Sequence, residues 1–521
     1  MQLNINDTFN KELPADPSLK NSPRQVENAC FSFVTPTVPA DSKLVHVSKE
    51  VTALLGISEK ETASEEFLKV FTGAKVMDGT TPYSMCYGGH QFGHWAGQLG
   101  DGRAINLTEV VHNNQRWALQ LKGAGATPYS RRADGLAVLR SSIREHLCSE
   151  AMHHLGVPTT RSLSLSLSGD QVMRDVMYNG NSAYEKGAIV CRVSPSFIRF
   201  GSFEIFASRK DYVNLRKLTD YTIKHFYKEI KTEGKEKYIE FFNTVLDRTL
   251  AMVIHWQRVG FVHGVMNTDN LSILGLTIDY GPYGWLEGYD IDWTPNTTDR
   301  QQRRYRYGQQ PGVALWNLFQ LANALYSLVE ESKPFEDALD RYKVNFAKAN
   351  TEMMKSKLGL QQDEKNDVAL FASLEETLSL TETDMTIFYR LLGNVSKSDS
   401  AKAILALINP AFYASEEVTG DVSSAWIDWL ETYRSRLHLE PLSDEDRKVK
   451  MNLVNPKYVL RNYMAQLAID SADEGDYSLI SELHELLRQP YAEQVEMEKW
   501  FVKRPEWARH KVGCSMLSCS S

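Results

Sequence analysis

Hydrophobic residues recur along this chain at two different spacings. Between about 75 and 130, short apolar runs such as 117–121 are set among dense glycines, which predicts β-strands joined by glycine loops, and a further strand is predicted at 188–193. From about 211 onward, apolar residues recur every three or four positions, as in 238–260 and 313–329, which predicts helices. The order predicts an α+β protein with a smaller β-rich lobe followed by a larger α-rich lobe, and a ligand site in the cleft between them.

One helix is predicted inside the β-rich part, over residues 134–156. Asp134 is expected to open it and Gly156 to end it. Its apolar positions follow at steps of three and four: Leu136, Leu139, Ile143, Leu147 and Ala151. Residues 1 to about 30 are polar and carry three prolines, so we expect an extended arm there rather than a packed element.

Composition narrows the class of protein. The chain has 521 residues, of which 42% are hydrophobic and 24% charged, as in ordinary folded proteins. A net charge of -8 argues against a nucleic-acid or membrane partner, since both need a concentrated cationic surface. We see no apolar run of the roughly 18 to 20 residues that a membrane span needs and no signal pattern, so a cytoplasmic protein is expected. The six scattered cysteines indicate neither a disulfide framework nor a zinc site.

The first candidate for chemistry is a glycine-rich turn within residues 87–107, closed by Gly100, Gly102 and Arg103. Without a Cβ, the backbone can approach a polyphosphate and direct N–H groups at it, and the guanidinium adds fixed positive charge. The turn matches neither GxxxxGK[ST] nor a clean GxGxxG. A tight turn without a ligand is therefore the alternative.

Two further candidates are basic. Lys122 directly follows the run 117–121 and precedes the predicted helix that carries Glu145. Strand, lysine, loop, helix and glutamate in this order form the arrangement by which kinases orient nucleotide phosphates. Arg192 and Arg199 flank a proline-containing bend, where two guanidinium groups could bind phosphate from separate directions. The alternatives are a surface lysine with a solvated glutamate, and arginines paired with surface acids.

The most informative segment is 260–290, which carries Asp269, Asn270 and, after an apolar stretch, Asp279. Asn270 and Asp279 can supply oxygen ligands to one Mg²⁺ or Mn²⁺ while Asp269 remains available as a base. Ordinary turn residues are the alternative for each of the three. His263 lies on an apolar approach and is expected to be a satisfied core histidine.

Three blocks carry a family resemblance: YGGHQFGHWAGQLGDGRA, LQLKGAGATPYSRRADGLAVLRSSIREHL and HGVMNTDNLSILGLTIDYGP. They resemble the selenoprotein O family, densely over about 80–330 and more loosely elsewhere. The resemblance implies a pseudokinase fold with its nucleotide reversed relative to ordinary kinases. The implied reaction moves AMP from ATP onto Ser, Thr or Tyr of proteins, with pyrophosphate leaving.

The resemblance also implies roles for individual residues. Asp269 is the implied proton acceptor, Glu145 the carboxylate that pairs the lysine, and Asn270 and Asp279 are the implied ligands of Mg²⁺ or Mn²⁺. The implied ATP contacts are Gly100, Gly102, Arg103, Lys122, Asp134, Gly135, Arg192, Arg199 and Asp279. The corresponding segments are an N-terminal extension at 1–75, a β-rich nucleotide-binding lobe at 76–205, an α-rich catalytic lobe at 206–450 and a C-terminal helical extension with a cysteine-containing tail at 451–521.

Several other functions compete with AMP transfer. A conventional kinase carries its base two residues after the histidine of HRD, but Val265 stands there after His263, which disfavours phosphoryl transfer. UMP transfer from UTP with Mn²⁺, a catalytically silent ATP-binding scaffold and a redox role of the Cys519 tail remain open. In the family, a redox link joins this tail to the loop after Asp-Tyr-Gly. No cysteine occurs between 192 and 513, which puts that link in doubt and leaves open a bridge of Cys519 to Cys514, to glutathione or to another protein.

Overall fold

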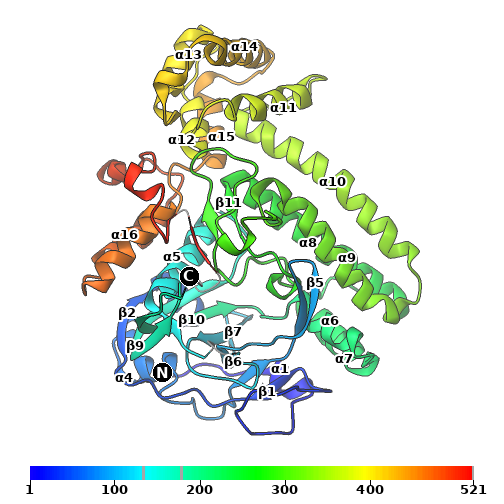
Figure 1. Ribbon diagram of the computed structural model, residues 1–521. Helices are drawn as coiled ribbons and strands as arrows, with labels where there is room; N and C mark the ends of the chain where they lie inside the picture. The colour runs from blue at the N-terminus through cyan, green and yellow to red at the C-terminus, as the bar shows by residue number, and fades with distance from the viewer. Residues whose placement is uncertain (132–134, 177–179, 515, 519–521) are drawn as a thin grey trace.

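Strands gather in the N-terminal part of the chain and helices in the rest (Figure 1). The computed structural model describes residues 1–131, 135–176, 180–514 and 516–518. Within these residues, seven strands form one antiparallel sheet in the order β1-β3-β6-β7-β10-β9-β2, and an eighth, β8, pairs with β10. In that order their bounds are Phe31–Phe33, Tyr83–Met85, Ala104–His112, Gln115–Lys122, Ala183–Ser194, Arg161–Arg174 and Lys43–Val47, with β8 at Ala137–Val138.

Alternation along the central strand β7 sorts its side chains onto two faces. Leu119 and Leu121 are fully buried in a cluster with Val51 of α2 (Lys49–Leu55) and Phe67 of α4 (Glu65–Phe71). The intervening polar side chain of Gln120 therefore faces away from α2 and α4, as does the strand-terminal Lys122. The predicted strands at 117–121 and 188–193 are confirmed as parts of β7 and β10.

Helix α5, Leu139–His154, packs against β9 and β10. The predicted helix exists there, but its predicted start is wrong by several residues. Leu136 forms a bridge with Ala124, and β8 follows before the helix begins, because pairing with β10 holds this stretch extended. Asp134, the predicted opening residue, lies outside the described residues.

The structure confirms the helices that the spacing of three and four predicts beyond residue 211. The long helices α8, α9 and α10 pack together, with α6 against α9. The helices from α6 onward are α6 Phe200–Ser208, α7 Tyr212–Phe226, α8 Gly234–Val259, α9 Gln310–Val329, α10 Lys333–Leu358, α11 Asp367–Leu378, α12 Met385–Leu392, α13 Ala401–Ile408, α14 Gly420–Leu437, α15 Asp444–Val454, α16 Asn462–Asp473 and α17 Ser478–Leu487. Helices α11 to α15 form a group at one end of the molecule (Figure 1).

One described helical stretch, Tyr307–Val329, is long and apolar enough to cross a membrane by length and composition. The sequence was expected to contain no such run. Leu318, Leu321 and Leu325 within it are fully buried, and the helix packs against α6 and α8. Such burial is typical of the core helix of a folded protein.

The prediction of an extended, unpacked arm over residues 1 to about 30 is wrong in part. Residues Thr8–Glu12 form helix α1, and Phe9 and Leu13 lie buried in the main core. The backbone N–H of Thr8 donates to the buried carboxylate of Glu109 at 2.7 Å. Phe9 stacks on Tyr83 of β3, so burial of apolar side chains and backbone hydrogen bonds together dock this polar segment.

The chain returns to the β-rich part near its C-terminus. Helices α16 and α17 both pack against α5 (Figure 1), where Leu483 of α17 belongs to the same buried cluster as Leu147 of α5. Residues more than three hundred positions apart thus share one core. The helix that carries Glu145 is covered by the sheet on one side and by the C-terminal helices on another.

Candidate active site

A cavity of about 560 Å³ lies where the sheet meets the loop between β11 (Phe261–Val262) and β12 (Gly284–Trp285). Eight of the residues singled out in the sequence line it: Gly100, Gly102, Arg103, Lys122, Arg192, Asp269, Asn270 and Asp279. They come from four stretches of sequence that folding brings together, at 100–103, 122, 192 and 269–279. The size falls in the range of small-molecule sites.

The glycine turn forms one wall. Gly100 has φ +78°, and a Cβ at this position would collide with the ring of Tyr129, so no other residue fits without rearrangement. Asp101 next to it is buried and accepts hydrogen bonds from the Met85 N–H at 3.1 Å and from Gln120 Nε2 at 3.2 Å. These bonds fix the turn against β3 and β7.

Lys122 is held at the end of β7 by a carboxylate from α5. Its Nζ lies 2.5 Å from Glu145 Oε2, and Arg192 Nη1 lies 3.1 Å from Glu145 Oε1. Burial lowers the pKa of Lys122, an effect that Glu145 opposes and Arg192 reinforces. One glutamate therefore anchors two cationic side chains that line the cavity.

Two arginines form ion pairs with the carboxylate of Asp279. Arg192 Nη1 lies 2.6 Å from Asp279 Oδ1, and Arg199 pairs with the other carboxylate oxygen. Burial would raise the pKa of Asp279, but Arg199, Arg192 and Lys122 outweigh burial and hold that pKa well below its usual range. Asp279 has φ +55°, a left-handed conformation that aspartate adopts more readily than most residues.

Asp269 has the opposite environment. It lies in the short 3-10 helix Thr268–Asn270, is 7% exposed, and accepts a hydrogen bond from Gln91 Nε2 at 3.2 Å. Its second carboxylate oxygen is buried without a hydrogen-bond partner. Burial raises the pKa of Asp269 to about 7, although Gln91 and Arg199 act against it. A Cβ at Gly89 would lie 2.9 Å from Asp269 Oδ1, so this glycine allows the β4–β5 hairpin (Gly88–Gln91 and His94–Gln98) to lie against Asp269.

Asn270 lines the same cavity. Its Nδ2 donates to the Val265 carbonyl at 2.9 Å, which leaves its Oδ1 available as a ligand. Asp279 keeps lone pairs beyond those its arginines use, so the two side chains form a hard oxygen set that suits Mg²⁺ or Mn²⁺. His263 is fully buried, and its Nε2 lies 2.9 Å from the Ile278 carbonyl, which confirms the core histidine that the sequence predicts.

Two of the predicted site residues, Arg199 and Gly135, do not line the cavity. Arg199 instead pairs with Asp279 and donates to the Asp269 carbonyl at 2.7 Å. Gly135, with φ +120°, lies outside the lining residues and close to Ala126, and Asp134 is outside the described residues. The sequence reasoning gave no role to four polar residues that line the cavity: Gln91, Arg131, Arg174 and Asn267. Their positions along the chain carry no spacing signal that could have revealed them.

The C-terminal tail lies against the loop that follows Asp279. The Leu517 N–H donates to the Pro295 carbonyl at 3.0 Å, and the Thr297 N–H donates to the Leu517 carbonyl at 2.7 Å. Cys514 is buried, and burial raises the pKa of its thiol to about 11, which disfavours the reactive thiolate. Cys519 lies outside the described residues.

Comparison with known proteins defines the class. The chain is 63% identical over 519 residues to the protein nucleotidyltransferase YdiU of Flavobacterium johnsoniae, covering 100% of this chain and 99% of that relative. It is 55% identical over 536 residues to the YdiU protein of Rhodopirellula baltica, again with 100% and 99% covered, and 51% identical over 522 residues to that of Aromatoleum aromaticum, with 99% of each covered. These relatives define the chain as a nucleotidyltransferase.

The family follows from a second comparison. Residues 17–488 match the family described as protein adenylyltransferase SelO. The chain therefore belongs to the SelO family of protein adenylyltransferases, as the resemblance of its three sequence blocks implies.

Proposed function

We propose that this enzyme transfers AMP from ATP to Ser, Thr or Tyr hydroxyl groups of proteins and releases pyrophosphate. The hydroxyl oxygen forms a bond to the α-phosphorus, and the bond from that phosphorus to the bridging oxygen of pyrophosphate breaks. The hydroxyl proton passes to Asp269. A base with a pKa near the working pH serves such a transfer best, and the pKa of Asp269 is raised to about 7.

Cationic side chains are suited to the phosphates. Lys122, Arg103 and Arg192 all line the cavity, and Glu145 keeps Lys122 and Arg192 in fixed positions. Preorganised charge of this kind stabilises a transition state without reorganisation during the reaction. Arg199 supports the site from outside the cavity, by holding both Asp279 and the backbone at Asp269.

Asn270 and Asp279 would hold a divalent ion, Mg²⁺ or Mn²⁺. Such an ion neutralises phosphate charge and orients the polyphosphate when bound. The fit rests on the free Oδ1 of Asn270 and on an Asp279 carboxylate that its arginines keep ionised. The protein itself contributes the ion pairs that fix the orientation of Asp279.

We also infer that the molecule is a kinase-like bilobal protein. An antiparallel sheet carries a strand-terminal lysine, a packed helix supplies the glutamate that pairs with it, and a loop after the sheet supplies Asp269, Asn270 and Asp279. This is the order of parts in a protein kinase. Val265 stands where a kinase would carry its HRD aspartate, so the base comes from a different position.

One contrast carries the proposal: a single cavity holds one aspartate kept ionised by arginines and another whose second oxygen is buried without a partner. This separates the metal-binding carboxylate from the proton-accepting one. It is the pattern in which two carboxyl groups take different catalytic roles.

The test compares ATP labelled at the α-phosphate with ATP labelled at the γ-phosphate. The enzyme is incubated with Mg²⁺ or Mn²⁺ and a mixture of candidate protein substrates, and label on protein is counted. Label is expected from the α position only, together with an added mass of AMP on the modified peptides. Label from the γ position alone would show a kinase, and no label from either, with nucleotide still bound, would show a silent scaffold. In the same assay, α-labelled UTP with Mn²⁺ tests UMP transfer.

A further inference from the structure

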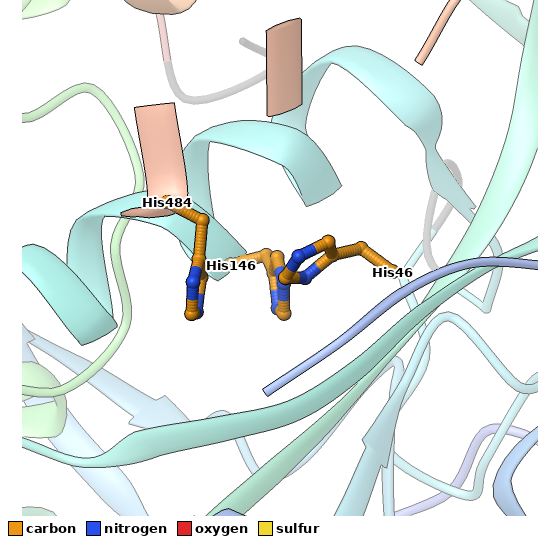
Figure 2. A group of neighbouring side chains, drawn as sticks. All are labelled: His46, His146 and His484. Atoms are coloured by element: carbon orange, nitrogen blue, oxygen red, sulfur yellow. The ribbon is translucent and has the colours of Figure 1, made fainter. Parts of the chain in front are cut away.

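Three histidines from distant parts of the chain meet at helix α5 (Figure 2), and none of the three lines the cavity. His46 lies on strand β2, His146 on α5 and His484 on α17. Each offers one ring nitrogen, and these three nitrogens lie within 4.8 Å of one another. Three imidazoles from three elements on one centre is a known donor set for transition metals.

Hydrogen bonding within the cluster leaves one ring unsatisfied. His46 Nδ1 lies 2.8 Å from His146 Nε2, and His146 Nδ1 lies 2.6 Å from Ser162 Oγ. His484 is 8% exposed, and its Nε2 is buried without a hydrogen-bond partner. A buried polar atom left unpaired costs free energy, and a metal ion bound to all three rings would satisfy it.

The groups around the three histidines favour neutral imidazole rings and a bound metal cation. Burial lowers the pKa of all three histidines, to about 4 for His46, so their lone pairs are available at neutral pH. Ser162 fixes the ring orientation of His146, as partners of metal-bound histidines commonly do. The buried Glu150 acts electrostatically on both His46 and His484, and it is held in place by Arg161 Nε at 2.8 Å.

We propose that His46, His146 and His484 bind one transition-metal dication of the Zn²⁺ type, separate from the metal of the nucleotide site. Nitrogen ligands favour Zn²⁺ or Co²⁺ over Mg²⁺, whereas Asn270 and Asp279 offer only oxygen. Two imidazole nitrogens on a tetrahedral zinc lie about 3.3 Å apart, so the pair at 2.8 Å needs to open by only about half an ångström. His46 is partly exposed, so its side of the cluster is accessible to solvent.

The site would join three elements that meet only in the folded chain. Strand β2 is at the edge of the sheet, and α17 belongs to the C-terminal helices. His146 directly follows Glu145, the residue that pairs with Lys122. A bound metal would therefore fasten the C-terminal helices to the helix that positions the nucleotide-binding lysine.

The test uses the full chain, stripped with a chelator and kept in excess Mg²⁺. Titration with Zn²⁺ is expected to reach one ion per chain, and Co²⁺ to give the visible absorption of a low-coordinate nitrogen site. His46→Gln and His484→Gln are each expected to weaken Zn²⁺ binding at least about 100-fold, since even supporting residues of such sites contribute 10- to 100-fold. Zn²⁺ is expected to raise the Tm of the parent protein and to leave the Tm of both variants unchanged.

Two controls separate this site from others. His255→Gln removes a partly buried histidine outside the cluster and is expected to bind Zn²⁺ like the parent. His153→Gln tests the neighbouring group of Glu50, His153 and His154 and is also expected to bind Zn²⁺ like the parent. The proposal is overturned if the folded parent binds no stoichiometric Zn²⁺ or Co²⁺, if both cluster variants bind as tightly as the parent, or if His153→Gln alone abolishes binding.

Discussion

Asp269 and Asp279 share one cavity, yet their surroundings move the pKa values of their carboxyl groups in opposite directions. Asp269 has one amide donor and a buried oxygen without a partner, whereas Asp279 has a guanidinium on each oxygen. Burial dominates at the first and positive charge at the second. Two residues of the same type therefore carry different chemistry.

The pH dependence of transfer follows from Asp269. Its carboxyl must be ionised to accept a proton, and burial raises its pKa to about 7. We expect kcat to fall about tenfold for each pH unit below about 7 and to level off above it. Asp269→Asn is expected to lower kcat by at least about 100-fold at pH 8, with ATP affinity retained, and its difference from the parent is expected to narrow below pH 7, where the parent's own base is protonated. A pH–rate profile with an unchanged kcat down to pH 5 would contradict the assignment.

Asp269 and Asp279 are expected to make the free energy of unfolding depend on pH in opposite directions. The pKa of Asp269 is raised, so its favourable contribution is present below about pH 4 and is lost as pH rises to about 7. Asp269→Asn is therefore expected to raise the free energy of unfolding at pH 8, by at most about 4 kcal/mol. The pKa of Asp279 is lowered, so its contribution is present above about pH 4 and is lost on acidification.

Asp279→Asn should accordingly destabilise the protein at neutral pH. It takes one of two carboxylate partners from Arg192, which keeps Glu145, and the nearest carboxylate from Arg199, in a largely buried place, at a cost of about 3 kcal/mol. Denaturant unfolding of both variants at pH 5 and pH 8 measures the two effects. Equal changes in the two variants would show that the pKa difference does not reflect their folded environments.

At the scale of elements, α5 is the part that joins the nucleotide cavity to the rest of the molecule. It packs against β9 and β10 on one side and against α16 and α17 on another, and Glu145 reaches from it to Lys122. A second glutamate on the same helix, Glu150, pairs with Arg161 and does not line the cavity. The helix thus carries a functional pair and a matched structural pair.

These two pairs allow a controlled comparison. Glu145→Gln removes the anion that holds Lys122 and Arg192, so ATP binding is expected to weaken about 10- to 100-fold, with a loss of stability of about 3 kcal/mol. Glu150→Gln is expected to cost similar stability and to leave ATP affinity within about twofold. Isothermal titration with ATP and thermal unfolding measure both quantities. Equal losses of affinity in the two variants would place the effect in the helix rather than in the lysine pair.

The sequence predicted the central elements because their spacing is local information. The strands around Leu119 and Val190, and helix α8, follow from alternation and three-and-four periodicity. The start of α5 and the docking of residues 8–12 were predicted wrongly, because both depend on pairing with distant segments. Such tertiary contacts override local propensity and leave no mark in a short window.

At the scale of the whole molecule, the cavity combines residues that lie far apart in the chain. Motif order singled out Lys122, Asp269 and Asp279, and these three line the same cavity, while their roles stay predictions. It could not predict Gln91 beside Asp269 or Arg174 in the lining, because isolated polar residues in a strand or turn look alike in sequence. The histidine cluster could not be predicted either, because its three members come from three elements that are distant in the sequence.

The contact between Leu517 and Thr297 allows a test of whether the C-terminal tail holds the loop that follows Asp279 in place. Deleting residues 516–521 removes the Leu517 backbone that accepts from the Thr297 N–H and donates to Pro295. Hydrogen exchange of the amides around 295–299 is expected to quicken at least about tenfold, whereas exchange in β6 and β7 remains unchanged. Uniformly faster exchange would instead indicate global destabilisation. Unchanged exchange at Thr297 would show that the tail contact is absent in solution.

The contact between Leu517 and Thr297 has a consequence for the order of events during synthesis. Leu517 is synthesised 220 residues after Thr297, so a nascent chain that has not reached Leu517 has no backbone partner for Thr297. The loop that follows Asp279 therefore reaches this support only after Leu517 has left the ribosome. A truncated translation product would contain every residue of the nucleotide cavity and would still lack this closing contact.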